Sequence, residues 1–280
     1  MNIKTIVPIV LMILLILTAV TVVNAKNIEI SANYSSKEIN SFFNRGTSLN
    51  GQTLANGDTV IFQKGTYEGL SLKITKSVNI KAKGTVKFKG DYSNNVAIKI
   101  NTKNVEISGL SIQNYYSTGI IINGDKNKIV KTSIKSCSDG ISISGSNNRV
   151  TNNKIQSNSE NGIKIKKGSK NTIDKNIINN NRLYGVYITN SNSNKIINNN
   201  INKNNDGITL FRASMNTISK NRLEKHTWNG LYIRSSSSNN KIKQNMMISN
   251  NCGIYSHMSS KNNIGKNTYS KNNIISTRFY

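Results

Sequence analysis

The chain has 280 residues with one proline and two cysteines, and its 38 basic and 12 acidic residues give a formal net charge of +26. Two cysteines are too few for the disulfide framework of a small secreted domain. The charge favours acidic partners such as cell-wall polysaccharides, uronate chains, anionic lipid surfaces or nucleic acid, although an AT-rich genome would also enrich lysine.

The N-terminus has the order of an export signal. Lys4 precedes an apolar run from Ile6 to Val23, and Val23 and Ala25 supply small residues before a cut after Ala25. We therefore expect residues 1–25 to be a signal peptide and exported protein to begin at Lys26. The run is also long enough to span a bilayer, so an uncleaved membrane anchor is the alternative. Both interpretations place the chain outside the cytoplasm, secreted or at the cell surface, where we expect no specific nucleic-acid partner.

Residues 26–56 predict a cap for one end of a repetitive fold. Ser35 and Glu38 have capping-box spacing, and Ile39, Phe42 and Phe43 form one apolar face of a short helix that ends near Gly46. An open end of a stack of strands exposes unpaired backbone and core, so an amphipathic helix here is expected to cover it.

Strands are predicted from residue 57 onward. Asn56-Gly57-Asp58 is a turn signal before the apolar strand 59–62, and Gly65-Thr66-Tyr67 then begins the first rungs. The segments 70–74 and 78–80 continue the pattern.

A dipeptide of glycine and an aliphatic residue then returns at steps of 21 to 23 residues. It stands at Gly119-Ile120, Gly140-Ile141, Gly162-Ile163, Gly185-Val186, Gly207-Ile208, Gly230-Leu231 and Gly253-Ile254. So steady a period indicates one structural unit stacked on copies of itself. We expect a single elongated domain over residues 57–280.

Each repeat holds about three short apolar segments separated by Asn, Ser or Gly, too brief for helices. Three short strands turned at each corner make one rung of a parallel β-helix with about 22–23 residues. Asparagine suits the corners because it tolerates the left-handed conformation and can bond amide to amide in a ladder. The predicted ladder is Asn153, Asn176, Asn199, Asn221, Asn245 and Asn267. A disordered polar tract is the alternative, but it would not keep isoleucine in register.

The same register places Ile173, Ile196, Ile218 and Ile242 in one inward column. It also separates Cys137 from Cys252 by five rungs, or roughly 24 Å at about 4.8 Å per rung. A disulfide needs Cα atoms within about 7 Å, so we expect no internal bridge.

The segment Gly-Asp-Thr-Val-Ile-Phe at 57–62, Gly-Thr-Tyr at 65–67 and the repeated Asn and Gly-Ile elements resemble right-handed parallel β-helix proteins of the NosD type. These belong to the carbohydrate-binding and sugar-hydrolase β-helix domains. With the export signal and the Lys/Asn/Ile bias, the chain looks most similar to exported adhesin-like β-helix proteins of methanogenic archaea. The resemblance covers residues 50–275 and implies the all-β fold, whereas this scaffold hosts lyases, hydrolases, binders and structural proteins alike.

Carboxylates for catalysis are sparse in the repeats. Asp139 and Asp206 both precede a repeat glycine, but three rungs separate them, which is roughly 14 Å. Glycoside hydrolysis requires two carboxyl groups about 5–9.5 Å apart, so this pair is too far apart. Asp139 and Glu160 lie on neighbouring rungs and are the candidate pair for catalysis or calcium binding, with solvated corner residues as the alternative. The lyases of this group use clustered acids with calcium and a basic proton acceptor, and we find no such cluster.

Soft metal ligands gather near the C-terminus: His226, Met246, Met247, Cys252, His257 and Met258. These residue types suit copper(I), and the NosD resemblance implies copper delivery. However, Met246 and Met247 fall where other rungs have aliphatic residues, so at least one is expected in the core. We predict neither a bound metal nor another cofactor.

The outer surface of the glycine strand predicts a binding face. Residues one and three after the glycine point inward, so those two and four after it point outward. Aromatic and cationic side chains occupy the outward positions of the last four rungs, with Trp228 just before one strand. They are Tyr187, Phe211, Tyr232, Arg234, Tyr255 and His257. Such a face suits sugars, although stacked tyrosines also stabilise neighbouring strands.

We therefore predict an exported, non-enzymatic right-handed parallel β-helix that binds carbohydrate or another acidic cell-surface polymer. A polysaccharide lyase or glycoside hydrolase is the alternative, and copper handling is a weaker one. Contact with a membrane is expected only through the N-terminal segment, if that segment is not cleaved.

Overall fold

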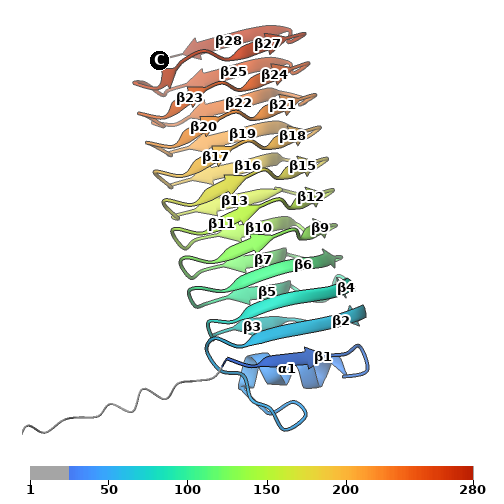
Figure 1. Cartoon of the computed structure of the whole chain (residues 1–280). Helices are drawn as coiled ribbons and strands as arrows, with labels where there is room; N and C mark the ends of the chain where they lie inside the picture. Colours follow the sequence, from blue (N-terminus) through green and yellow to red (C-terminus); the bar gives the residue numbers. More distant parts are fainter. Residues whose placement is uncertain (1–24, 280) are drawn as a thin grey trace, which may run out of the picture.

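The computed structural model describes residues 25–279, which wind into a parallel β-solenoid whose rungs stack along one axis (Figure 1). Each repeat strand pairs in parallel with the strand one rung before it and one rung after it, as β13 does with β10 and β16. The predicted all-β parallel architecture is confirmed. The predicted signal or anchor lies outside the described residues, apart from Ala25. Within residues 25–279, no helix has the length and apolar character needed to cross a membrane.

One sheet of the solenoid has ten strands and contains the repeated glycine strands. Its strands are β3 (Leu72–Ile74), β5 (Val96–Ile100), β7 (Thr118–Ile122), β10 (Asp139–Ile143), β13 (Ile163–Lys166), β16 (Tyr184–Thr189), β19 (Asp206–Phe211), β22 (Asn229–Arg234), β25 (Cys252–His257) and β28 (Ile274–Phe279). The alternation predicted for this sheet is confirmed in β22, where Leu231 and Ile233 are buried while Tyr232 and Arg234 lie on the outer side.

The second sheet has eighteen strands and bends around two sides of the solenoid. Its first strands are β1 (Asn27–Ile30), β2 (Thr59–Glu68), β4 (Asn79–Lys89) and β6 (Glu106–Gln113). Each later rung contributes two short strands, because β6 pairs with both β8 and β9. The pairs are β8 (Lys128–Val130) and β9 (Ser133–Lys135), β11 (Arg149–Thr151) and β12 (Lys154–Gln156), β14 (Thr172–Asp174) and β15 (Ile177–Asn179), β17 (Lys195–Ile197) and β18 (Asn200–Asn202), β20 (Thr217–Ser219) and β21 (Arg222–Glu224), β23 (Lys241–Lys243) and β24 (Met246–Ile248), and β26 (Asn263–Ile264) and β27 (Thr268–Ser270).

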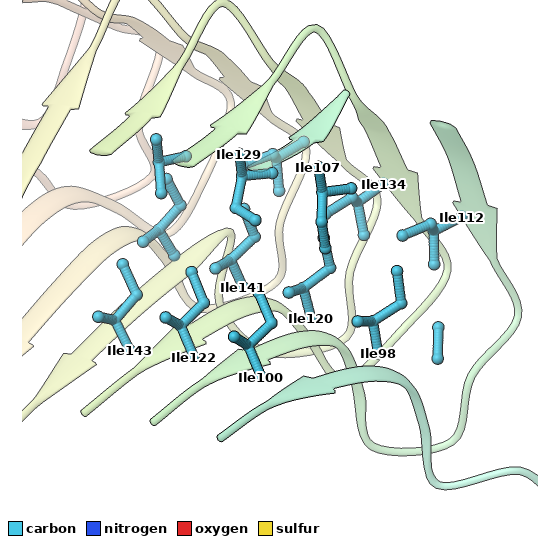
Figure 2. Close-up of a cluster of buried hydrophobic side chains, with 14 of the residues drawn as sticks. Ile98, Ile100, Ile107, Ile112, Ile120, Ile122, Ile129, Ile134, Ile141 and Ile143 are labelled. Carbon is cyan, nitrogen blue, oxygen red and sulfur yellow. The ribbon is translucent and has the colours of Figure 1, made fainter. Parts of the chain in front are cut away.

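The core is a set of isoleucine columns between the sheets. Figure 2 shows Ile107 and Ile129 of the larger sheet pointing toward Ile120 and Ile141 of the ten-stranded sheet. The predicted inward column is confirmed, because its members pair in register and have no exposed surface. They are Ile173, Ile196, Ile218 and Ile242. Each rung therefore buries its apolar side chains against the rungs on either side of it.

Asparagine ladders line the corners, and the predicted ladder is one of three. In it, the Asn199 amide oxygen accepts hydrogen bonds from the Asn176 backbone N–H at 2.9 Å and from the Asn176 side-chain amide at 3.0 Å. The second ladder runs through Asn127, Asn148, Asn171, Asn194, Asn216, Asn240 and Asn262. The third runs through Asn158, Asn181, Asn204, His226, Asn250 and Asn272. These bonds satisfy backbone groups that the corners leave without strand partners.

The predicted reason for asparagine at the corner needs a correction. For the ladder asparagines from Asn153 to Asn245, the left-handed residue is the one before the asparagine. Its φ lies between 56° and 59° at Asn152, Lys175, Asn198, Lys220 and Gln244. The ladder asparagines themselves are buried from Asn153 to Asn245, and Asn267 in the last rung is half-buried. Their side chains point inward to stack, so a neighbour has to make the bend.

The predicted cap is confirmed as helix α1 (Ser36–Arg45). Ser35 and Glu38 form the capping box, Gly46 ends the helix with φ 72°, and Ile39, Phe42 and Phe43 are buried. The helix also covers the edge of β3 with side chains. Asn40 accepts from the Ser71 N–H at 2.8 Å, and Asn44 accepts from the Lys73 N–H at 2.6 Å.

Cys137 and Cys252 are not joined by a disulfide within the described residues, in line with the separation that the register predicted, and both side chains are buried. Burial raises the pKa of the Cys137 thiol to about 11, so this thiol stays protonated at neutral pH.

Candidate binding face

The aromatic side chains predicted on the ten-stranded sheet lie in two registered columns. Tyr187 is opposite Thr209, which is opposite Tyr232, which in turn is opposite Tyr255. The parallel column runs through Thr189, Phe211, Arg234 and His257. One face of β16, β19, β22 and β25 thus holds all of them. We call Tyr184, Tyr187, Phe211, Tyr232, Arg234, Tyr255 and His257 the aromatic face.

Arg234 joins the two columns. Its guanidinium carbon lies 4.9 Å from the Phe211 ring centroid and 5.3 Å from the Tyr232 ring centroid, within cation–π range of both. Tyr232 in turn stacks on Tyr255 with ring centroids 5.1 Å apart and an interplanar angle of 29°. Tyr255 and His257 have nearly parallel rings at 6.4 Å. The cation is therefore held in place by rings, half-buried rather than extended into solvent.

Tyr187 lies across Thr209 from Tyr232. Thr209 has no exposed surface although it occupies an outward position. Thr209 is much smaller than the tyrosines on the rungs before and after it. We infer that the larger side chains around it cover it, which accounts for its burial. Tyr184 extends this end of the face, with its ring 4.9 Å from that of Tyr187, and burial raises the pKa of Tyr184.

A buried carboxyl group supports the face. Asp206 is 5 % exposed, and one of its oxygens accepts from the Asn229 backbone N–H at 2.9 Å and from the Asn229 amide at 2.8 Å. The other oxygen lies 3.4 Å from the Thr209 hydroxyl. Burial raises the pKa of Asp206, while these hydrogen bonds and the charge of Arg234 oppose the shift. Asp206 thus links the first residue of β19 to the first residue of β22.

Sequence reasoning missed one member of the aromatic face, Tyr184, and one cation beside the face, Arg212. Tyr184 precedes a repeat glycine, and Arg212 follows its strand, so neither occupies the second or fourth position that defined the columns. The Arg212 guanidinium lies 5.1 Å from the Phe211 ring centroid. Trp228, which sequence reasoning included, is 55 % exposed just before β22.

The two candidate catalytic carboxylates differ in environment. Asp139 is 7 % exposed, accepts from the Asn161 amide at 2.6 Å and pairs with Lys164 at 3.3 Å. Glu160 is exposed, and its backbone continues the ladder between Ser138 and Leu183. Through Asn161 and Lys164, Asp139 therefore links β10 to the next rung.

The soft ligands are divided between core and surface. Met247 is fully buried in the core, as expected for at least one of the pair, whereas Met246 and Met258 are 42 % and 60 % exposed. His226 is buried in the third asparagine ladder. Across the described residues, no group of three or more His, Cys, Asp or Glu side chains is arranged to hold a metal ion.

The fold and the corner ladders define a class, the right-handed parallel β-helix proteins. The family model for the right handed beta helix region matches residues 96–245 and 139–278, and the chain belongs to this family. No curated protein matches the chain.

Solved structures agree on the fold. Pectate lyase Pel9A is 15 % identical with a TM-score of 0.64, and the match covers 86 % of this chain and 78 % of that one. DFA-IIIase from Arthrobacter chlorophenolicus A6 without its lid is 12 % identical with a TM-score of 0.60, covering 83 % and 72 %. The A-module of the Azotobacter vinelandii mannuronan C-5 epimerase AlgE4 is 14 % identical with a TM-score of 0.53, covering 91 % and 87 %. At these identities the likeness concerns the fold alone.

Proposed function

We propose that this chain is an exported, non-enzymatic β-helix protein that binds an acidic carbohydrate of the cell surface through the aromatic face, in the manner of an adhesin. The observation that carries the proposal is the continuous surface from Phe211 through Arg234 and Tyr232 to Tyr255. Aromatic rings there offer flat apolar surfaces to the C–H faces of sugars, and Arg234 offers paired donors to a carboxylate or sulfate.

The arrangement favours an extended ligand over a small molecule. The face covers β16, β19, β22 and β25, four consecutive rungs, which is roughly 15 Å along the axis at about 4.8 Å per rung. That length accommodates a few sugar units. Because the rings are fixed by backbone register and by stacking, little conformational entropy is lost when a sugar docks on them.

The similar structures support a carbohydrate ligand. Two of them are a pectate lyase and a mannuronan C-5 epimerase. The chain shares their fold, and its net charge of +26 suits an acidic polymer.

A double variant tests the proposal. Tyr232→Ala with Arg234→Ala removes the centre of the face, and we expect at least a tenfold loss of affinity for the glycan identified on an array of acidic and neutral oligosaccharides, measured by calorimetry. Ser142→Ala with Ser144→Ala is the matched control, since these residues stand two and four positions after the repeat glycine Gly140, the first within β10 and the second just after it. Unchanged glycan affinity in the Tyr232/Arg234 variant would refute the binding role. Cooperative unfolding of this variant below the melting temperature of the control would make the face structural instead.

A polysaccharide lyase or glycoside hydrolase is the second candidate, and the similarity to a pectate lyase and to DFA-IIIase favours it. Incubating the protein with polygalacturonate, alginate and neutral glycans tests this function directly. If the protein releases unsaturated or reducing ends and the Glu160→Gln variant does not, the proposed function becomes catalysis that depends on Glu160. We expect no release.

A further inference from the structure

A second surface, on the eighteen-stranded sheet, carries cations in a regular alternation. Along one strand column, Arg149, Thr172, Lys195, Thr217 and Lys241 are opposite one another in register. Along the adjoining corner, the left-handed position is occupied in successive rungs by Asn152, Lys175, Asn198, Lys220 and Gln244. Where the strand position holds a cation, the corner of the same rung holds a neutral residue. In the next rung the strand position is neutral and the corner holds the cation. From β11 to β23, every rung therefore presents one cation from these two columns.

These cations face solvent. Lys175, Lys195, Lys220 and Lys241 are all exposed. None of the ion pairs formed within the described residues involves any of the four. Arg149 alone is paired, with the largely buried carboxylate of Asp174 at 2.9 Å. Four consecutive rungs thus carry uncompensated positive charge.

The fold does not require lysine at these positions. A left-handed corner favours asparagine or glycine, and Asn152 and Asn198 make the same bend with the same φ of 56°. On the strand, Thr172 and Thr217 fill the position with a better strand former. Alternation keeps like charges from lying directly opposite each other, which would destabilise the sheet. The pattern therefore preserves a charge on each rung while limiting repulsion between rungs.

This surface points away from the aromatic face. The core side chains of the two sheets point toward one another in Figure 2, so the outer side of the β11, β14, β17, β20 and β23 column lies on the far side of the core from β16, β19 and β22. A ligand on one face leaves the other open.

We propose that the basic face, defined as Lys175, Lys195, Lys220 and Lys241, binds an extended linear polyanion that lies along the solenoid axis. Its cations follow at one per rung, about 4.8 Å apart along the axis, and a polymer with phosphate or carboxylate groups presents its charges in a row. Threonine and asparagine stand at the neutral positions of the two columns and can donate hydrogen bonds. The outward position between the columns holds Asp174, Ile197, Ser219 and Lys243, so a single half-buried isoleucine is the only apolar side chain among them, which does not make the apolar face that inserts into a bilayer. This face is separate from the proposed glycan site.

The chain supplies its own neutral replacements for the test. The variant Lys175→Asn, Lys195→Thr, Lys220→Asn, Lys241→Thr gives each position the residue found one rung away. The control variant Lys73→Thr, Lys99→Thr, Lys203→Asn, Lys271→Asn removes four exposed lysines elsewhere, two on strands and two at left-handed corners. Both variants lose four positive charges, so net charge is matched.

The probes are inorganic polyphosphate and poly-glutamate, which contain no sugar ring, and vesicles of phosphatidylglycerol with phosphatidylcholine. We expect the basic-face variant to bind both polymers at least tenfold more weakly than the parent at about 0.15 M salt, and the control variant to stay within about threefold. Equal losses of affinity in the two variants would mean that net charge alone determines polymer binding, which would overturn the proposal. Binding to the vesicles without binding to either polymer would overturn it in favour of a membrane surface.

Thermal unfolding of the two variants keeps the comparison interpretable. Both should unfold cooperatively at or above the melting temperature of the parent, because the corner and strand replacements suit their backbone conformations. A basic-face variant that is destabilised relative to the control would show that the lysines serve the fold, which also overturns the proposal.

Discussion

His226 shows how a single residue takes on a role that its chemistry alone does not suggest. Its ring occupies the place of an asparagine in the third ladder, where Nδ1 accepts from the Asn204 N–H at 3.2 Å and Nε2 lies 3.1 Å from the Ile201 carbonyl oxygen. This pattern requires a neutral imidazole with its proton on Nε2. Burial lowers the pKa of His226 to about 4.

The stability of the protein should therefore fall with acid because of His226. As pH drops below about 6.5, the unfolded chain binds a proton that the folded state binds only near pH 4, so the free energy of unfolding decreases between these values. The loss attributable to His226 should approach about 3 kcal/mol at pH 4. His226→Asn, which restores the ladder residue, should remove this part of the pH dependence. Urea unfolding of both proteins at pH 7, 6 and 5 measures the difference, and parallel curves would contradict the assignment.

The role of His226 was available from the sequence but was not used. It stands 22 residues after Asn204 and 24 before Asn250, the same two steps that separate Asn199, Asn221 and Asn245 in the predicted ladder. As a soft metal ligand, His226 was grouped with Met246, Met247 and Met258. Its spacing from Asn204 and Asn250 instead predicts a place in the third asparagine ladder. Tyr184 and Arg212 were missed for the opposite reason, since side chains beside a column reach the face by packing, which spacing does not encode.

At the scale of elements, helix α1 acts as a substitute for a neighbouring strand. Asn40 and Asn44 each accept from one backbone N–H of the β3 segment and donate to one carbonyl, those of Gly69 and Ser71. They lie four residues apart on one helix face, which matches the two-residue spacing of the edge groups. The helix thereby satisfies an edge that would otherwise pair with another chain.

Removing these two amides should expose the edge. Asn40→Ala with Asn44→Ala loses four modest hydrogen bonds, and we expect a destabilisation of about 2 kcal/mol with increased self-association. Lys37→Ala, at an exposed position of the same helix, is the control. Thermal unfolding and size-exclusion chromatography follow the two effects. If the double variant stays monomeric and as stable as the control, the edge is protected by the apolar contacts of Phe42 and Phe43 alone.

The strand columns make a second prediction for an element. Ile196 has no exposed surface, while its neighbour Ile197 lies half-buried on the outer side of β17. Ile196→Ala should therefore cost about 2–5 kcal/mol in unfolding free energy, because it leaves a cavity between Ile173 and Ile218. Ile197→Ala should cost clearly less. Denaturant unfolding ranks the pair, and equal losses would mean that the inward register is wrong.

The inward register was predictable because period and alternation are properties of the sequence itself. Isoleucine repeated at fixed intervals can be buried at every rung only if the rungs stack in register. The helical cap was predictable from Ser35 and Glu38 for a similarly local reason. The left-handed corner residues were assigned one position too late. Asparagine can adopt the left-handed conformation and can also form an amide ladder, and the sequence does not show which of these roles a given asparagine has.

For the whole molecule, the two proposed faces differ in the physical origin of their binding. The aromatic face acts through ring contacts with one central arginine, and these contacts are short-ranged and only partly electrostatic. The basic face acts through exposed lysines, whose attraction for a polyanion is screened over about 10 Å at 0.1 M salt. Salt should therefore separate the two activities in one protein.

Raising NaCl from about 0.05 M to about 0.5 M should weaken polyphosphate binding by more than tenfold, and glycan binding to the aromatic face by only a few-fold. Both affinities are measured by calorimetry on the unmodified protein, with the basic-face variant as a reference for the residual polyphosphate signal. The physical reason is that added ions compete with lysine contacts but do not displace a sugar from a tyrosine ring. Equal salt slopes for the two ligands would mean that one charged surface binds both, and the glycan would then have to be reassigned to the lysines.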